Sequence, residues 1–220
     1  MKRVLFNDAW TVTELKMKDG LLLPVFQKDV TLPYDAMHVT KRHKDAPLAA
    51  ASYLPGKWEY RKTFMVPQEW QEKTVGFYFE GVYENALVYI NGDLAISQNN
   101  GYVPFYIEAD RFLKYGAEDE ILVSVHVANG ARWYSGAGIY RDVYLCTADS
   151  VHIQPNSLRV ETVYAPSCSD PQTQNGRDLA EACIRVRTLV KNEGAAQKRY
   201  VCMLGSSMQW AAAQWREPSR

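Results

Sequence analysis

The sequence has no excess of charge of either sign. It carries 25 lysine and arginine residues against 25 aspartate and glutamate residues, so its formal net charge at neutral pH is zero. A basic face that would attract nucleic acid or an anionic membrane is therefore not expected. Apolar residues make up 47% and charged residues 23% of the chain, which is close to the globular average and argues against a disordered or fibrous protein.

Long apolar runs are also missing. Two basic residues stand near Met1, but no apolar stretch of signal-peptide length follows them, and no later stretch is long enough to span a bilayer. These features predict a cytoplasmic protein.

Cysteine is scarce, and its spacing is unlike that of a metal site. There is no Cys-x-x-Cys pair and no histidine at ligand spacing nearby, which argues against zinc. We interpret the cysteines as reduced thiols and assume no disulfide pairing. They are Cys146, Cys168, Cys183 and Cys202.

Helical periodicity is nearly absent as well. Aromatic residues reach 12%, and apolar positions alternate in short runs separated by Gly, Pro and Asn. In residues 120–127 the side chains of Ile121, Val123, Val125 and Val127 share one face. Asn91-Gly92, between runs 86–90 and 94–96, predicts a type I′ hairpin. Further strands are predicted at 60–66, 75–79, 140–145, 157–163, 182–190 and 199–204.

This pattern predicts an all-β fold, a sandwich or jelly roll, and disfavours a parallel α/β fold. One helical turn is expected at 110–115, capped by Asp110 and ended by Gly116. Aromatic side chains within or beside the strand patterns are expected in the core. They are Trp10, Trp58, Phe64, Phe77 and Phe79.

Two β units meet near Thr147–Val151. The first, residues 1–148, reads as a jelly roll. The second, residues 149–220, reads as an immunoglobulin-like sandwich cut short, because only about three strands appear where such a sandwich needs about seven.

Five segments share residues with a known family. They are Leu32–Asp35 (LPYD), Trp58–Phe64 (WEYRKTF), Phe79–Tyr83 (FEGVY), Val88–Gly92 (VYING) and Arg132–Val143 (RWYSGAGIYRDV). Together they resemble the N-terminal sugar-binding domain of glycoside hydrolase family 2, which includes β-galactosidases and β-glucuronidases. The last segment is most similar to the β-galactosidase branch.

The resemblance implies a galactose-binding-domain-like jelly roll followed by an immunoglobulin-like domain. It also implies that the two catalytic glutamates lie in a third domain, a (β/α)₈ barrel, for which there is no room after Leu204. The chain is therefore expected to be the non-catalytic front of a β-galactosidase-like enzyme, inactive alone and helping to position a β-galactoside. No catalytic residue is assigned to it.

Candidate sugar contacts are the rings of Trp133 and Tyr134, because a sugar packs its C–H face on an aromatic ring. Fixed polar partners for its hydroxyls would be Asp35, Asn99, Asn100 and Arg132. The alternative for Trp133 is a core or inter-domain anchor. In some family members a carboxylate in this loop holds a cation, but Arg132 stands at the aligned position. Neither a metal nor a cofactor is expected.

Two other features receive structural interpretations. The glycines Gly136 and Gly138 are expected to permit a sharp turn and close backbone approach. The acidic run Glu118–Glu120 is read as a solvated turn rather than a catalytic carboxylate pair.

Two alternative functions stay open. One is a stand-alone carbohydrate-binding module, which an exposed aromatic platform would support. The other is a protein-interaction module that uses β-sandwich surfaces, and a homo-oligomer through such surfaces is left open. No nucleic-acid or membrane partner is expected.

Overall fold

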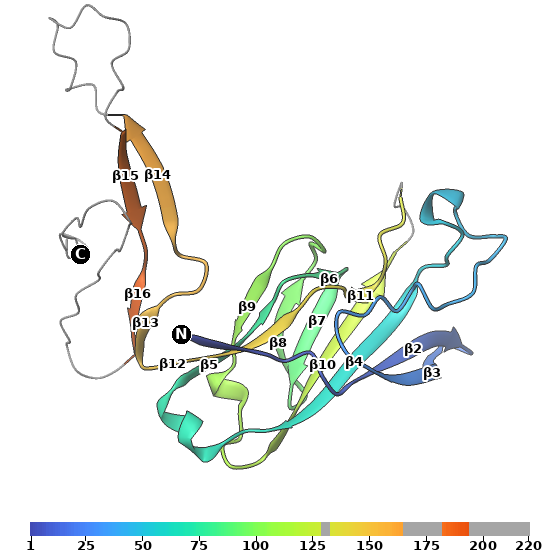
Figure 1. Cartoon of the computed structure of the whole chain (residues 1–220). Helices are drawn as coiled ribbons and strands as arrows, with labels where there is room; N and C mark the ends of the chain where they lie inside the picture. The colour runs from blue at the N-terminus through green and yellow to red at the C-terminus, as the bar shows by residue number, and fades with distance from the viewer. Residues whose placement is uncertain (129–132, 165–181, 194–220) are drawn as a thin grey trace, which may run out of the picture.

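The computed structural model describes residues 1–128, 133–164 and 182–193. Within them, two antiparallel sheets pack face to face (Figure 1). The first sheet has four strands in the order β1-β12-β5-β9, and the second has six in the order β3-β2-β4-β10-β7-β8. The strands of the first sheet are β1 Lys2–Leu5, β12 Val143–Ala148, β5 Thr74–Phe79 and β9 Phe105–Glu108. Those of the second are β3 Leu21–Val30, β2 Trp10–Lys18, β4 Gly56–Met65, β10 Glu118–Val127, β7 Ala86–Ile90 and β8 Asp93–Gln98.

Shorter elements complete the described residues. β6 (Val82–Tyr83) pairs with β11 (Gly138–Ile139) at one end of the sandwich. Three 3₁₀ helices connect strands: η1 Leu48–Ala50, η2 Gln68–Glu72 and η3 Asp110–Phe112. The predicted all-β sandwich is confirmed.

The core lies between the two sheets because each strand turns alternate apolar side chains inward. On β10, Ile121, Val123 and Val125 are fully buried, as their alternation predicts. Of the aromatic residues predicted in the core, Trp10, Trp58, Phe77 and Phe79 are buried, and Phe64 is partly buried against them. Burial of each ring contributes roughly 2–3 kcal/mol.

The predicted hairpin at Asn91-Gly92 is confirmed. Both residues have positive φ, +52° and +91°, as a type I′ turn requires, and β7 pairs with β8 across them. The Asn91 side chain also binds outside the hairpin: it donates to the Phe112 carbonyl at 2.8 Å and accepts from the Glu120 amide at 3.1 Å. The turn is therefore fixed against η3 and β10.

Three local expectations are wrong. Residues 140–142 are not strand, because β12 starts only at Val143. The helical turn η3 ends at Phe112, and Asp110 does not cap it: its carboxylate instead accepts from the Val75 amide at 2.7 Å. The acidic run is strand rather than turn, and Asp119 within it is only 1% exposed, accepting from the Lys114 amide at 3.0 Å.

Strands β2 and β3 were not predicted. Only Trp10 and Val12 of β2 are buried, and β3 is exposed along its length up to Val30. The hairpin therefore extends past the sandwich, and a strand exposed on both faces needs no alternating pattern. Its exposed apolar residues are Met17, Leu21, Leu22, Leu23, Val25 and Phe26.

Beyond Ala148 the described strands form two small pairs. β13 (Val151–Ile153) pairs with β16 (Val190–Asn192), and β14 (Arg159–Tyr164) pairs with β15 (Ala182–Arg187). β14 matches the predicted run at 157–163. The run predicted as one strand at 182–190 is divided, because β15 ends at Arg187 and β16 begins at Val190 with a different partner strand. The run at 199–204 lies outside the described residues. The division at 148 and the immunoglobulin-like assignment stay predictions.

Of the cysteines, Cys146 is a buried free thiol. Cys183 lies in β15, and Cys168 and Cys202 lie outside the described residues.

A polar cluster ties β16 to the four-stranded sheet. Lys191 contacts Glu108 of β9 at 2.8 Å and Glu193 at 2.7 Å. Thr74 of β5 donates to the other Glu193 oxygen at 2.5 Å. The hydrogen bond from Lys191 is the largest influence that lowers the pKa of Glu193, and the two carboxylates raise the pKa of Lys191 to about 12.

We therefore expect Glu193→Gln to loosen the β13–β16 pair from the sandwich. Because the pKa of Glu193 is lowered, its contribution is present above the usual glutamate pKa of ~4.3 and is lost as pH falls through the lowered value. The protection factors of amides in 151–153 and 190–192 should fall several-fold and those in 121–127 should stay high, both in the variant and in wild-type protein at acid pH. The control is Glu161→Gln, which removes an exposed ion pair with Arg187 inside the β14–β15 pair; equal acceleration by both variants would contradict the tie.

Candidate functional site

Three loops meet at one end of the sandwich: residues 34–38, 99–102 and 133–138. The backbone of the first loop runs alongside the third, because the Tyr34 amide donates to the Ile139 carbonyl and the Ala36 amide to the Ala137 carbonyl, both at 2.9 Å. The second loop joins through Tyr140, whose hydroxyl donates to the Gly101 carbonyl at 2.8 Å. We call this group of three loops the loop cluster.

Asp35 holds the loop cluster together. Its Oδ1 accepts from the amides of Met37 at 3.0 Å and Ala137 at 2.9 Å, and its Oδ2 accepts from the Tyr134 hydroxyl at 2.5 Å. A third amide, that of His38, lies 3.4 Å from Oδ1. Such charge-assisted hydrogen bonds are the stronger class. The carboxylate is therefore already engaged by protein donors on both oxygens.

Tyr134 is a hydrogen-bond donor in this arrangement. Burial and the neighbouring Asp35 carboxylate raise the pKa of Tyr134 well above its usual value, so the hydroxyl keeps its proton at neutral pH. Its ring lies 5.4 Å from that of Tyr53, centroid to centroid. Tyr134 is thus half-buried and fixed on two sides.

Two glycines permit the close approach, as expected from the sequence. Gly136 has φ +74°, and a Cβ there would lie 2.8 Å from the Asp35 carboxylate. Gly138 has φ +104°, and a Cβ there would collide with the buried Tyr60 side chain. The Tyr60 hydroxyl donates to the Tyr34 carbonyl at 2.8 Å. Only glycine fits both positions without strain.

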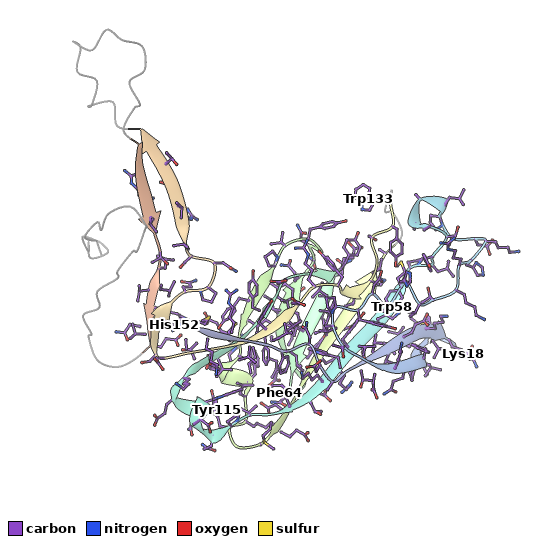
Figure 2. The ribbon with its side chains drawn as sticks, in the orientation of Figure 1. Lys18, Trp58, Phe64, Tyr115, Trp133 and His152 are labelled. Atoms are coloured by element: carbon purple, nitrogen blue, oxygen red, sulfur yellow. The ribbon has the colours of Figure 1, made fainter. Side chains whose placement is uncertain are left out.

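Trp133 stands at the tip of the loop cluster. Its side chain is 58% exposed, and Figure 2 shows the ring projecting from the end of the sandwich. Its indole nitrogen donates to the Tyr102 hydroxyl at 3.2 Å, and the Tyr102 ring packs edge-on against Tyr83 at 5.4 Å. The core-anchor alternative for Trp133 is therefore wrong.

The structure thus brings most of the predicted site residues together. Asp35, Trp133 and Tyr134 lie in one hydrogen-bonded assembly, and Asn99 and Asn100 are exposed beside it. The Asn100 side chain accepts from the Tyr102 amide at 2.9 Å. Arg132 lies outside the described residues.

Sequence reasoning missed the tyrosines that support the loop cluster. They are Tyr53, Tyr83, Tyr102 and Tyr140. The sequence contains a signal for Tyr102, because this residue follows the Asn-Asn-Gly turn at the edge of the predicted site. Tyr83 and Tyr140 lie within the segments 79–83 and 132–143 that carry the family resemblance, and Tyr53 lies farther away in the sequence. No local pattern shows that these three rings approach the loop cluster.

The same loop cluster can be set against known proteins. Residues 42–140 match the family model described as glycosyl hydrolase 2 galactose-binding domain-like. The chain belongs to glycoside hydrolase family 2. The matched range includes the loops at 99–102 and 133–138, so the family 2 domain carries most of the site.

Relatives of similar sequence agree with this assignment, and a solved structure shares the fold. The beta-galactosidase BoGH2A of Bacteroides ovatus is 38% identical over 104 residues, which are 46% of this chain and 12% of that protein. A beta-glucuronidase of Formosa agariphila is 34% identical over 158 residues, 63% of this chain and 15% of that protein. A beta-glycosidase structure from Bacteroides vulgatus shares the fold, with a TM-score of 0.71 at 24% identity over 88% of this chain.

The family 2 chain spans a small part of these proteins: 12% and 15% of the two relatives and 25% of the solved chain. Among the residues that the structure describes, no group of three or more His, Cys, Asp or Glu side chains could hold a metal ion. Within that same part of the chain, no helix is long and apolar enough to cross a membrane.

Proposed function

We propose that the loop cluster forms one wall of the substrate site of a family 2 glycoside hydrolase and positions a β-galactoside there. The observation that carries this proposal is an exposed indole held in a fixed place. An aromatic ring of this size is normally buried, yet Trp133 is exposed while hydrogen-bonded to Tyr102 on a loop that Asp35 anchors. Its face is available to the C–H face of a sugar.

The polar groups divide into two roles in this proposal. Asp35 acts mainly through Tyr134 and the backbone, because its oxygens are occupied by protein donors. Asn99, Asn100 and Arg132 are the groups proposed to bond sugar hydroxyls. No residue of this wall is assigned to bond cleavage, and its contribution is orientation of the substrate.

The choice of a galactoside rests on the sequence segment 132–143 and on relatives named as beta-galactosidases, although others are named as beta-glucuronidases. The cytoplasmic location and the homo-oligomer stay predictions.

The exposed apolar residues of β3 favour a protein-contacting surface as the second candidate role. Sedimentation of the chain, with Leu23→Lys as the variant, tests this role: a monomer at every concentration would contradict self-association.

Trp133→Ala should weaken sugar binding and leave the fold intact. Because one wall supplies few contacts, methyl β-D-galactoside should bind the wild-type chain in the millimolar range or weaker, and the variant several-fold more weakly. The melting temperature should change little, because the ring is mostly outside the core. Trp133→Phe keeps a ring and removes the bond to Tyr102, so its affinity should fall between the two. Unfolding by Trp133→Ala, or unchanged affinity at the loop cluster, would overturn the proposal.

A further inference from the structure

A concave site lies far from the loop cluster. A cavity of about 580 Å³ opens among η2, η3, β8 and β9 and reaches Ser150 and Glu193. Tyr115 lines it just before β10 begins, whereas Trp133 follows the end of β10, and Figure 2 shows the two at opposite ends of the sandwich. Ten residues of strand separate these ends by about 30 Å. The cavity is therefore independent of the proposed sugar wall.

One polar group at the cavity lacks a partner. The Tyr106 hydroxyl is buried and makes no hydrogen bond in the described part of the chain. The ring lies across β5, where Gly76 leaves room for it: a Cβ on Gly76 would collide with the Tyr106 ring and hydroxyl. Buried hydroxyls are normally paired, so an unpaired one on a residue that lines the cavity favours a bound group that reaches it.

Two other lining side chains have no ion pair in the part of the chain that the structure describes. Arg111 packs its guanidinium over the Phe112 ring at 4.6 Å and forms no ion pair among the described residues. Glu72 likewise has no ion pair within those residues. The Asp110 carboxylate accepts from the Val75 amide. The cavity thus brings together the guanidinium of Arg111 as a hydrogen-bond donor, carboxylates as acceptors and the Tyr106 hydroxyl.

The charges of the lining select among ligand classes. Four carboxylates and two cations line the cavity. Lys191 already pairs with two of the carboxylates, Glu108 at 2.8 Å and Glu193 at 2.7 Å, and the lining cation Lys73 pairs with Asp149 at 3.2 Å. Among the described residues this leaves the carboxylates of Glu72 and Asp110 without an ion pair, against one such cation, Arg111. A phosphate or a uronate would meet a net negative wall. A purely apolar ligand would leave Tyr106, Arg111 and the carboxylates unpaired, which is unfavourable.

The cavity is also lined by apolar side chains. Ile96, Ile107 and the Tyr115 ring contribute carbon surface beside the polar groups. A ligand that matches both parts is neutral, rich in hydroxyls and has a C–H face, which describes a saccharide. The volume lies within the range of small-molecule sites, roughly 300–1,000 Å³.

We propose that this cavity is a second carbohydrate site, which takes a neutral mono- or disaccharide and contacts it through Tyr106 and Arg111. This site is additional to the sugar wall proposed at Trp133, because the cavity would hold a second sugar at a distance from the substrate. It does not depend on the role proposed for the loop cluster.

The test is an NMR titration of the whole 220-residue chain with methyl β-D-galactoside, lactose and glucuronic acid. The neutral sugars should shift amide signals in 105–115, and glucuronic acid should shift them less. Tyr106→Phe removes one oxygen atom, and its affinity at this cavity should fall about five- to tenfold, as expected for one hydrogen bond. Its melting temperature should stay equal or rise, because an unpaired hydroxyl is removed.

Matched variants separate this site from the first. Arg111→Ala should weaken the cavity shifts, whereas Trp133→Ala should leave them unchanged and affect only the loop cluster. Tyr89→Phe, on β7 and outside the cavity, should change neither. The proposal is overturned if no neutral sugar shifts 105–115, if those shifts are insensitive to Tyr106→Phe and Arg111→Ala, or if glucuronic acid binds better. Shifts confined to the loop cluster would overturn the cavity site and still support the proposed function.

Discussion

Replacing Gly138 by alanine is expected to destabilise the sandwich by about 2–5 kcal/mol. A left-handed conformation costs a residue with a Cβ about 1–2 kcal/mol, and overpacking a buried site costs typically 1–3 kcal/mol. Gly138 has φ +104°, and its Cβ would collide with the fully buried Tyr60. This is a large share of the 5–15 kcal/mol that stabilises a typical domain, and urea unfolding would measure it.

The matched control for this change is Gly92→Ala. Gly92 has a similar φ, +91°, but a Cβ there would meet nothing within 4 Å. Gly92→Ala should therefore lose only the backbone part, about 1–2 kcal/mol. Equal losses at the two glycines would show that the contact with Tyr60 has no effect on stability.

Asp35→Ala is expected to open the loop cluster and abolish sugar binding by its wall. The substitution removes the acceptor of the Tyr134 hydroxyl and of two well-placed amides. Hydrogen bonds to charged groups contribute about 1.5–3 kcal/mol each, and solvent reaches this end of the sandwich, so we expect a total loss of about 2–4 kcal/mol. Hydrogen exchange should accelerate in 34–38 and 133–138, and the Trp133 fluorescence anisotropy should fall.

Two controls distinguish anchoring from a general loss of charge. Asp29→Ala removes an exposed carboxylate that, among the described residues, accepts a side-chain hydrogen bond from Thr11 alone, at 2.8 Å, and should leave the loop cluster closed. Asp35→Asn keeps one acceptor oxygen for the amides but presents an amide group to Tyr134, so its effect should be intermediate. If Asp35→Ala leaves exchange in 133–138 unchanged, Asp35 does not anchor the loop.

The sequence predicts the local features of this protein well. Alternation in 120–127 places Ile121, Val123 and Val125 in the core because a strand turns successive side chains to opposite faces. Asn91-Gly92 predicts the hairpin because few residues other than Asn and Gly accept the backbone angles of its turn. The fold class, the turn at Gly136 and Gly138 and the family resemblance depend on such short patterns.

Only the tertiary structure decides which of these local features meet. Asp35 and Tyr134 are 99 positions apart, and their bond depends on how the sheets close rather than on either neighbourhood. The exposure of Trp133, the burial of Asp119 and the unpaired Tyr106 hydroxyl over Gly76 also follow from packing between distant strands. Periodicity and turn chemistry act over a few residues, whereas strand order and side-chain burial arise from contacts along the whole chain.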